Sequence, residues 1–380
     1  MRSISSLNAH ERSWVHLPTP AMYRPNFIKY QVGIAVFFFV WLSWHLDIHQ
    51  QIAEKARQLA RPHDIPYDGM TGSEVFLPGK AAEYCSHYRL EPADSEMVHK
   101  RKIYDLLLIN TEVEMLEIRI GQMAPYVDYF VILESDTTFT DHPKPLYIRD
   151  NWELFKPWHK KMILRTMDLD KSKESSTWDR EHSSRNAMYE QVIPSLMDEQ
   201  AASFDDILIV SDVDEIPKPE ILRALRNCNV PVRNTIYSSV YYYSYQWRLN
   251  IDWPHPQATL YRGADTILPS ELRGQGGGHE FHYGGWHCSY CFSTVEEMAE
   301  KLNSFSHSEF NQDEFKSVEH ILNVTRNGLD LFNRADAAFR RVERNFDVPD
   351  YVKQHSNKFR YLIDRDPPNG NFKDHSPIIA

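Results

Sequence analysis

The sequence predicts an α/β fold in which helices cover a largely parallel central sheet. Between residues 104 and 227, short apolar runs alternate with segments of helical periodicity, and this alternation is typical of parallel sheets. Hydrophobic residues make up 42% of the 380-residue chain, which is enough for the core of one large or two smaller domains. After residue 227, aromatic-rich segments predict antiparallel strands instead.

The parallel part of the sheet is predicted from four short apolar runs, of the length and composition of buried strands. These runs are 104–110, 129–134, 161–165 and 206–210. The helices predicted between and after them are 112–127, 179–197 with a break near Pro194, and 218–227, which starts next to Pro219.

The second half of the globular region is predicted to be less regular. Residues 236–250 and 257–263 are rich in aromatic residues and predict antiparallel strands. The glycine-dense stretch 272–292 predicts a loop, and the sequence from about residue 294 to residue 343 predicts helices. We expect the last residues, 346–380, to form a tail.

The N-terminal region predicts a membrane anchor. Residues 1–30 carry a net charge of +3, which leaves −14 for the rest of a chain whose total is −11. The segment "VGIAVFFFVWLSWHL" (32–46) contains no Asp, Glu, Lys or Arg. A basic flank before an apolar segment indicates an uncleaved signal anchor with a cytosolic N-terminus, and a cleaved signal peptide or a buried helix is the alternative. The expected order is a cytoplasmic tail (1–30), anchor (31–48), stem (49–100), globular domain (101–345) and tail (346–380).

The charge and the cysteines limit the possible partners further. A net charge of −11 argues against nucleic acid as a partner, because that partner requires a basic surface. All four cysteines, Cys85, Cys228, Cys288 and Cys291, follow the predicted anchor. We expect structural disulfides rather than a zinc site, with the pairing left open. Asn323 begins a glycosylation tripeptide.

Acidic residues follow the last predicted parallel strand. In "ILIVSDVDEIP" (207–217), Asp212 and Asp214 come directly after an apolar run, with no basic residue beside them. Ligands of open α/β sheets bind beyond the carboxyl ends of the strands. A pair of carboxylates there suits a divalent cation, which would in turn hold a diphosphate leaving group. A chance occurrence, a helix-capping role for Asp214, and a phosphatase with an aspartate nucleophile are the alternatives.

Three segments together resemble a known family. "DLLLIN…EVEMLEIRIGQMAPYVDYFVILES", "SDVDEIP" and "GGWHCSYCF", in this order, resemble glycosyltransferase family 17, the β-1,4-mannosyl-glycoprotein 4-β-N-acetylglucosaminyltransferases. The resemblance covers about residues 104–332. It implies a GT-A-like fold, a type II Golgi membrane protein, and inverting transfer from UDP-N-acetylglucosamine. It also implies the β-linked core mannose of an N-glycan as acceptor, so that the product carries a bisecting residue.

Site residues are assigned by matching the motif and by chemistry. Asp212 and Asp214 match the acidic motif of the family and are expected to bind Mn²⁺ or another divalent cation and the donor diphosphate. His287 is a candidate third metal ligand, and we expect the glycines before it to let the backbone approach a nucleotide. The other candidates for donor binding are Glu134, Arg185 and Asn186, an arginine being well shaped to clamp a phosphate.

The inverting reaction also needs a base that removes the proton of the acceptor hydroxyl. Glu280 and Asp330 are the candidate carboxylates. Two other functions stay open: a transferase of the same fold with another donor or acceptor, and an inactive, membrane-anchored glycan-binding protein.

Overall fold

The computed structural model describes Trp41 and residues 75–376, apart from 139, 141, 168–175, 305–306 and 336. The chain divides into two compact units, Met1–Tyr67 and Asp68–Ala380. The predicted cytoplasmic tail, the anchor except for Trp41, and the first half of the predicted stem lie outside the described residues. No helix in the described part of the chain has the length and apolar character needed to cross a membrane.

The second unit is built on one mixed sheet, which has ten strands in the described residues. Its main path runs in the order β10-β7-β6-β8-β4-β1-β2-β3, and β9 pairs with both β5 and β6. The strands are β1 (Ile103–Ile109), β2 (Tyr129–Ser135), β3 (Met162–Met167), β4 (Ile207–Ser211), β5 (Glu215–Pro217), β6 (Arg233–Tyr242), β7 (Trp247–Trp253), β8 (Gln257–Leu260), β9 (His279–Ser289) and β10 (Phe339–Arg341).

The predicted parallel half of the sheet is confirmed. Strand β1 pairs in parallel with β2 and β4, and β2 pairs in parallel with β3. In register, Leu107 of β1 lies between Ile132 of β2 and Ser211 of β4. The carboxyl ends of these strands therefore lie side by side, and the chain leaves β4 for Asp212 at that edge. The strands from β6 to β8 are antiparallel, as their aromatic-rich sequences predict.

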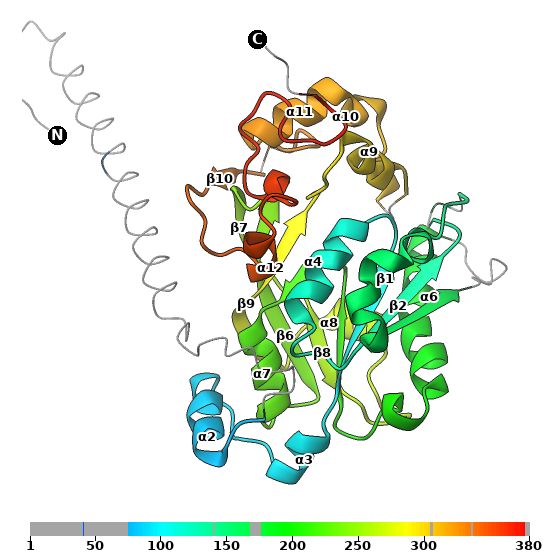
Figure 1. Cartoon of the computed structure of the whole chain (residues 1–380), viewed down its shortest axis with the longest axis vertical. Coiled ribbons are helices and arrows are strands. Elements are labelled where there is room, and N and C mark those ends of the chain that lie inside the picture. The colour runs from blue at the N-terminus through cyan, green and yellow to red at the C-terminus, as the bar shows by residue number, and fades with distance from the viewer. Residues whose placement is uncertain are drawn as a thin grey trace, which may run out of the picture. The chain divides into compact units, whose positions relative to one another are not determined.

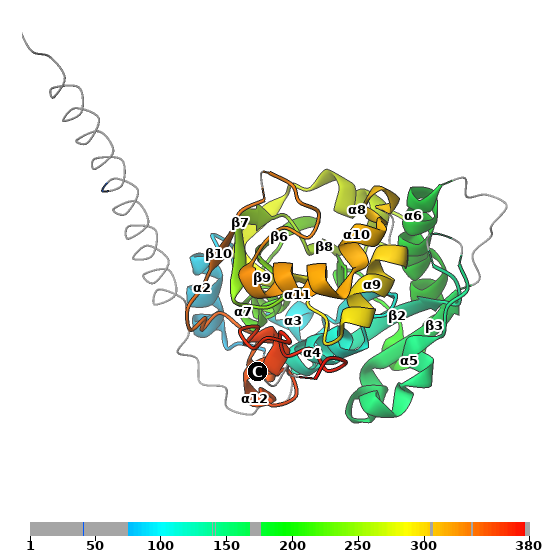
Figure 2. The ribbon, with the colours of Figure 1, turned by 90° about the horizontal axis from the view of Figure 1, so that it is seen from above.

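Helices cover both faces of the sheet (Figures 1 and 2). The helices are α2 (Pro78–His87), α3 (Ser95–Lys100), α4 (Val113–Met123), α5 (Tyr147–Asp150), α6 (Thr177–Ala187), α7 (Pro219–Asn227), α8 (Pro269–Gln275), α9 (Val295–Ser304), α10 (Asp313–Lys316), α11 (Val318–Asn327) and α12 (Asp350–Gln354). A long 3₁₀ segment, Trp152–Lys161, precedes β3, and α6 continues as a π turn, Met188–Val192. In Figure 1, α9, α10 and α11 lie at the end toward which β9 runs.

The alternation of side chains along β1 explains how the two layers of helices are attached. Tyr104 and Leu106 point to one face, where they join a buried cluster with Met188 and Val192 beyond α6. Asp105 points to the other face and bonds to Arg119 of α4. Successive residues of a strand face opposite sides of the sheet. A strand such as β1, in which almost every side chain is buried, therefore contacts helices on both faces.

The glycine-dense stretch forms a strand rather than the predicted loop. Strand β9 runs parallel to β6 and places His287 opposite Val240. A Cβ at Gly285 would collide with Ser238 of β6, and one at Gly284 would collide with Ile236. These glycines therefore allow β9 to pack closely against its neighbours, and the approach of a nucleotide to them stays a prediction.

The C-terminal segment is an integral part of the unit rather than a tail. Arg365 is fully buried and donates hydrogen bonds to the backbone carbonyls of Tyr243, Phe292 and Gly370. The polar side chain thus ties β6 and the turn after β9 to the end of the chain. Apolar side chains of the same segment are buried as well, among them Val352, Phe359, Leu362 and Phe372.

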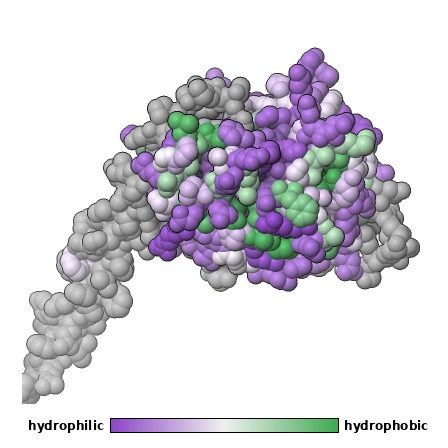
Figure 3. Space-filling view, turned by 90° about the horizontal axis from the view of Figure 1, so that it is seen from below, coloured by the Kyte–Doolittle hydropathy of each residue, from purple (hydrophilic) through white to green (hydrophobic). Residues whose placement is uncertain are grey.

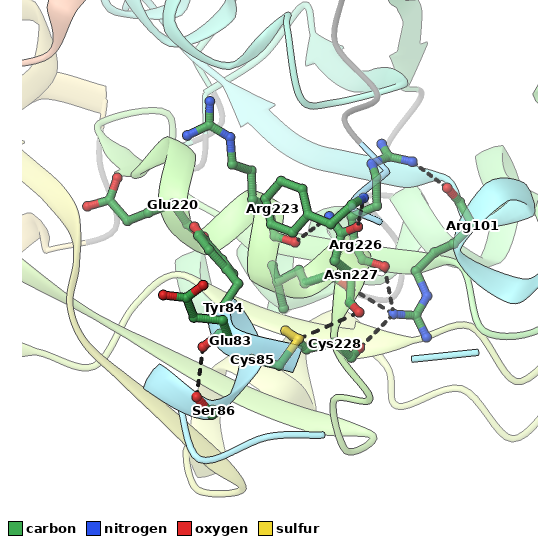
Figure 4. Close-up of a disulfide and its surroundings, with 12 residues drawn as sticks. Glu83, Tyr84, Cys85, Ser86, Arg101, Glu220, Arg223, Arg226, Asn227 and Cys228 are labelled. Carbon is green, nitrogen blue, oxygen red and sulfur yellow. Dashed lines mark hydrogen bonds between the residues drawn. A yellow bond between two sulfur atoms is a disulfide. The ribbon is translucent and has the colours of Figure 1, made fainter. Parts of the chain in front are cut away.

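The last part of the predicted stem also belongs to the unit. Cys85 of α2 forms a disulfide with Cys228, the residue that ends α7, across a sequence separation of 143. Beside it, Arg101 donates to the carbonyls of Leu225 and Cys228 (Figure 4). The second disulfide joins Cys288 and Cys291 directly after His287. The prediction of disulfides rather than a zinc site is confirmed.

On the face of the molecule seen in Figure 3, hydrophobic residues are interspersed with hydrophilic ones. The most exposed large apolar side chains, Leu77, Met197 and Phe346, are far apart in the sequence. Single exposed apolar residues are normal on a folded protein, so we infer no docking surface from them.

Candidate functional site

The two aspartates lie on a tight turn between β4 and β5. The backbone N–H of Asp212 donates to the Glu215 carboxylate over 2.9 Å, and the N–H of Glu215 donates to the carbonyl of Asp212 over 3.1 Å. The Asp212 side chain is 39% exposed, whereas that of Asp214 is only 10% exposed. The turn therefore presents one carboxylate to solvent and keeps the other mostly enclosed.

A buried arginine holds the backbone of this turn in place. The guanidinium of Arg119, on α4, donates to both carboxylate oxygens of Asp105 on β1, at 2.8 and 2.7 Å. It also donates to the Ser211 hydroxyl at 2.6 Å and to the carbonyls of Asp212 and Glu215 at 3.2 and 2.5 Å. Neither ion-paired side chain is exposed. Arg119 thus fixes the backbone on which both aspartates stand.

Sequence reasoning missed this pair of residues. Asp105 interrupts an apolar strand and Arg119 lies among apolar residues of a helix. Charged residues at such positions are almost never fully buried unless they are paired. One acidic and one basic residue, each inside an apolar element, could therefore have predicted this buried ion pair from the sequence.

Two arginines bind the first aspartate. One oxygen of Asp212 accepts from Arg185 of α6 at 2.7 Å, and the other accepts from Arg273 of α8 at 2.5 Å. Partial burial by itself raises the pKa of Asp212, but the two guanidinium groups outweigh it and hold that pKa well below its usual range. The expectation that this carboxylate lacks a partner in the chain was wrong, because the arginines are distant in sequence and arrive from two helices.

Glu215 holds Arg273 in place. The carboxylate accepts two hydrogen bonds from Arg273, at 2.7 and 2.8 Å, and a third from the Trp253 indole at 2.6 Å. Burial opposes ionisation of Glu215, yet Arg273 lowers its pKa to about 2. Sequence reasoning also missed Arg273, which lies in the stretch predicted to be a glycine-rich loop.

The second aspartate is less firmly paired. The nearest basic side chains to the Asp214 carboxylate are Lys301 of α9 at 3.6 Å and His287 of β9 at 3.8 Å. Among the described residues, no group donates a hydrogen bond to it. Lys301 is shared with Glu112, at 3.3 Å. Burial raises the pKa of Asp214 above its usual value, and Lys301 and His287 offset this only in part. This carboxylate therefore has capacity for another cation.

The three predicted metal ligands come together in space, but they are not arranged as a metal centre. In the described part of the chain, no three His, Cys, Asp or Glu side chains are placed to hold an ion. His287 lies opposite Glu215 on the neighbouring strand, and its Nε2 lies 3.8 Å from the Asp214 carboxylate. Its other ring nitrogen, Nδ1, is buried without a partner among the described residues. Asp214 and His287 thus fit as two ligands of one divalent cation. Each oxygen of Asp212 accepts one arginine hydrogen bond and keeps a second lone pair.

Of the predicted donor-binding residues, Arg185 lies in the site and two others have different contacts. Glu134 is buried and accepts from the backbone N–H groups of Ile148 and Arg149, at the start of α5. The Asn186 side chain accepts from the N–H of Ser270, at the start of α8. Both side chains accept from helix N-termini, so the structure gives each of them a structural role, and their binding of a donor stays a prediction.

The two predicted catalytic carboxylates, Glu280 and Asp330, have contacts of their own, and a role for either as the base stays a prediction. Glu280 precedes His287 by seven residues along β9, which places it roughly 20 Å away. It lies near Tyr237 and His282, at 3.3 Å from each. Asp330 is buried and held by the Arg334 guanidinium at 2.7 Å. One residue is at the far end of a strand that was predicted to be a loop, and the other is a structural ion pair.

A small pocket adjoins the turn. It lies at the carboxyl ends of β1, β2 and β3, and its lining includes Asn110, Ser135, Lys144, Met167 and Ser184. Ser184 directly precedes Arg185, so the pocket and the Asp212 ion pair share α6. The Lys144 ammonium donates to the carbonyl of Asn110 over 3.3 Å, and burial lowers its pKa. The pocket thus combines an apolar floor with a few polar groups, as small-molecule sites do.

Comparison with known proteins agrees with the family resemblance. The model of the family "Glycosyltransferase family 17" matches residues 35–367. Similar curated proteins include the β-1,4-mannosyl-glycoprotein 4-β-N-acetylglucosaminyltransferases of Rattus norvegicus and Homo sapiens. Each is 21% identical over 343 residues, covering 76% of this chain and 61% and 62% of the relative, respectively. The chain therefore spans less than two thirds of the length of these relatives.

Proposed function

The chain belongs to glycosyltransferase family 17, and on this basis we propose that it transfers N-acetylglucosamine from UDP-N-acetylglucosamine to the β-linked core mannose of N-glycans, in a β-1,4 linkage. The observation that carries the proposal is the family match over residues 35–367. The names of its relatives support the reaction class. The charged turn beside a pocket at the carboxyl edge of the sheet supports the location of the donor.

The donor is proposed to lie across the pocket and the turn. Its nucleoside would occupy the pocket, where Asn110 and Ser135 offer polar groups and Met167 offers an apolar wall. Its diphosphate would then reach Arg185, whose Nη1 is buried without a hydrogen-bond partner among the described residues. A guanidinium is well suited to a phosphate because its donors match the phosphate oxygens in pairs.

The residues of the turn support departure of the nucleotide. As the bond from the sugar to the diphosphate breaks, negative charge develops on the phosphate that leaves. Arg185, Arg273 and Lys301 are positioned around the turn before the donor arrives, so they can stabilise that charge without reorganisation. A divalent cation, with Mn²⁺ as the expected one, would add Lewis-acid stabilisation of the same charge and would be held by Asp214 and His287.

Incubation of the purified full-length chain with UDP-N-acetylglucosamine, Mn²⁺ and an N-glycan tests this proposal. We expect release of UDP that depends on the acceptor, and a product heavier by one N-acetylhexosamine that mass spectrometry places on the core mannose. Arg262→Gln is the matched control, because Arg262 pairs with Asp205 at 2.8 Å and makes no contact with the turn. Turnover with a different nucleotide sugar would favour a transferase of the same fold with another donor. Glycan binding without any turnover would favour an inactive glycan-binding protein.

We also propose a Golgi type II topology with the second unit in the lumen. The two disulfides within that unit support this proposal, because disulfides persist in oxidising compartments. Protease added to intact microsomes should remove only the first thirty or so residues and leave a protected fragment that contains the second unit. Digestion of the region between Cys85 and Cys291 in intact vesicles would contradict the lumenal placement, and vesicles opened with detergent provide the control.

A further inference from the structure

The two disulfides of the chain close loops of very different length. Cys85 and Cys228 are 143 positions apart, whereas Cys288 and Cys291 are only 3 positions apart. A disulfide stabilises a fold mainly by restricting the unfolded chain, and this effect increases with the length of the loop. The short loop therefore has the smaller stabilising effect of the two, and its position beside the turn indicates another role.

The short loop is hydrogen-bonded directly to the turn that carries the two aspartates. The backbone N–H of Cys288 donates to the carbonyl of Asp214 over 3.1 Å, next to the pairing of Glu215 with His287. Both cysteines of the loop are buried. A shift of the backbone at Cys288 would therefore be passed to Asp214 through this hydrogen bond.

Aromatic rings in and beside the short loop face the ammonium of Lys301. This ammonium lies 5.8 Å from the centroid of the Tyr290 ring and 5.5 Å from that of Phe292, within the range of a cation–π interaction. It also lies 3.6 Å from the Asp214 carboxylate. Tyr290 lies between the two cysteines with a φ of 53°, a left-handed conformation that is uncommon for a residue with a side chain. Such a conformation persists only where the surroundings impose it, so closure of the loop helps to hold the Tyr290 ring against Lys301.

The short disulfide thus supports the site at two points, one on the backbone and one on a charged side chain. We propose that the Cys288–Cys291 disulfide is a positioning element, which fixes the backbone of Asp214 and the ammonium of Lys301 relative to each other. Its effect on turnover rests on the proposed function, in which Lys301 stabilises the charge that develops on the departing nucleotide. The bond serves the geometry of the site more than the stability of the fold.

The long disulfide provides a matched comparison, because it lies at the opposite edge of the sheet. Arg101, just before the start of β1, donates to the carbonyl of Cys228 (Figure 4). The turn instead follows the carboxyl end of β4, which runs parallel to β1. Loss of the Cys85–Cys228 bond should therefore weaken the fold and leave the turn in place.

Kinetics and melting curves of two double variants of the full-length chain test this inference. Cys288→Ala with Cys291→Ala should lower kcat by about 10- to 100-fold, since a small misplacement of groups around the reacting atoms has an effect of that order. The KM for the glycan should stay close to the wild-type value, and the melting temperature should fall only slightly. Cys85→Ala with Cys228→Ala should show the reverse, a clearly lower melting temperature and a nearly unchanged kcat at a temperature where the variant is folded.

Hydrogen–deuterium exchange followed by mass spectrometry provides a second readout, which needs no turnover. Opening of the short loop should speed amide exchange in the peptides that cover residues 211–217 and 285–292, because the bond from Cys288 to Asp214 is no longer held in place. The variant without the long disulfide should exchange at the wild-type rate in these peptides.

Three outcomes would overturn the inference. The first is a wild-type kcat in a folded chain without the short disulfide, and the second is wild-type exchange at the turn in that variant. The third is an equal loss of kcat in both double variants, which would reflect a general weakening of the fold. If the wild-type chain releases no UDP with any glycan, the proposed function fails, and the exchange rates alone then decide whether the short disulfide positions the turn.

Discussion

Asp214→Asn should lower kcat by about 10²–10³-fold, a loss typical of removing one electrostatic stabiliser of the transition state, and should leave the melting temperature unchanged or slightly raised. Burial raises the pKa of Asp214, so its ionised form is less favourable in the folded chain than in the unfolded chain. That penalty appears as the pH rises through the unfolded and folded pKa values of this carboxyl and is complete above the folded one, and a neutral amide of the same shape removes it. The assay is UDP release, and scanning fluorimetry at pH 7 gives the melting temperature.

Asp212→Asn is the comparison that tests whether the two aspartates differ in how firmly they are paired. This variant should also lose turnover, but it leaves Arg185 and Arg273 without their shared anion, so it should melt at a lower temperature than the wild type. A wild-type kcat for Asp214→Asn would contradict the proposed role of the turn. An equal drop in melting temperature for both variants would contradict the difference in pairing between the two aspartates.

Arg119→Met should destabilise the chain by about 3–5 kcal/mol, because it leaves a fully buried Asp105 without its partner. Denaturant-induced unfolding measures the loss. Arg262→Met is the matched control, since it removes an arginine from an ion pair in which the side chains are 35% and 25% exposed. Such exposed pairs contribute only about 0–1 kcal/mol.

The double variant Arg119→Met with Asp105→Leu separates support of the fold from support of the turn. Replacing a buried ion pair with apolar residues of similar size often restores stability, so most of the loss should be recovered. The carbonyls of Asp212 and Glu215 remain without their donor, so kcat should stay well below the wild-type value with KM little changed. Full recovery of kcat together with stability would show that Arg119 supports the fold alone.

The parallel half of the sheet could be predicted because each strand is a local signal. The apolar runs at 104–110 and 206–210 match β1 and β4 to within one residue at each end. Strand β9 was missed because its glycines suggest a loop when read locally, while in the structure they permit close contact with β6. That reason is visible only when the neighbouring strand is in place.

The site, too, could be predicted only where the signal is local in the sequence. Asp212, Asp214 and Arg185 come together as expected, since the motif follows a strand and α6 packs beside it. The ion pair with Arg273 joins residues 61 positions apart, and the bond from Arg119 to the carbonyl of Asp212 spans 93 positions. No local pattern encodes such contacts. Glu280 and Asp330 were chosen for their chemical type, and their assignment as the base stays a prediction.

The ion pairs of Asp212 also determine the charge balance of the turn. Carboxylates gathered at one turn would repel one another if no counter-charge were near. Arg185 and Arg273 supply the counter-charge from within the same polypeptide. The folded chain therefore carries the charge compensation of this turn within itself, before any ligand is bound.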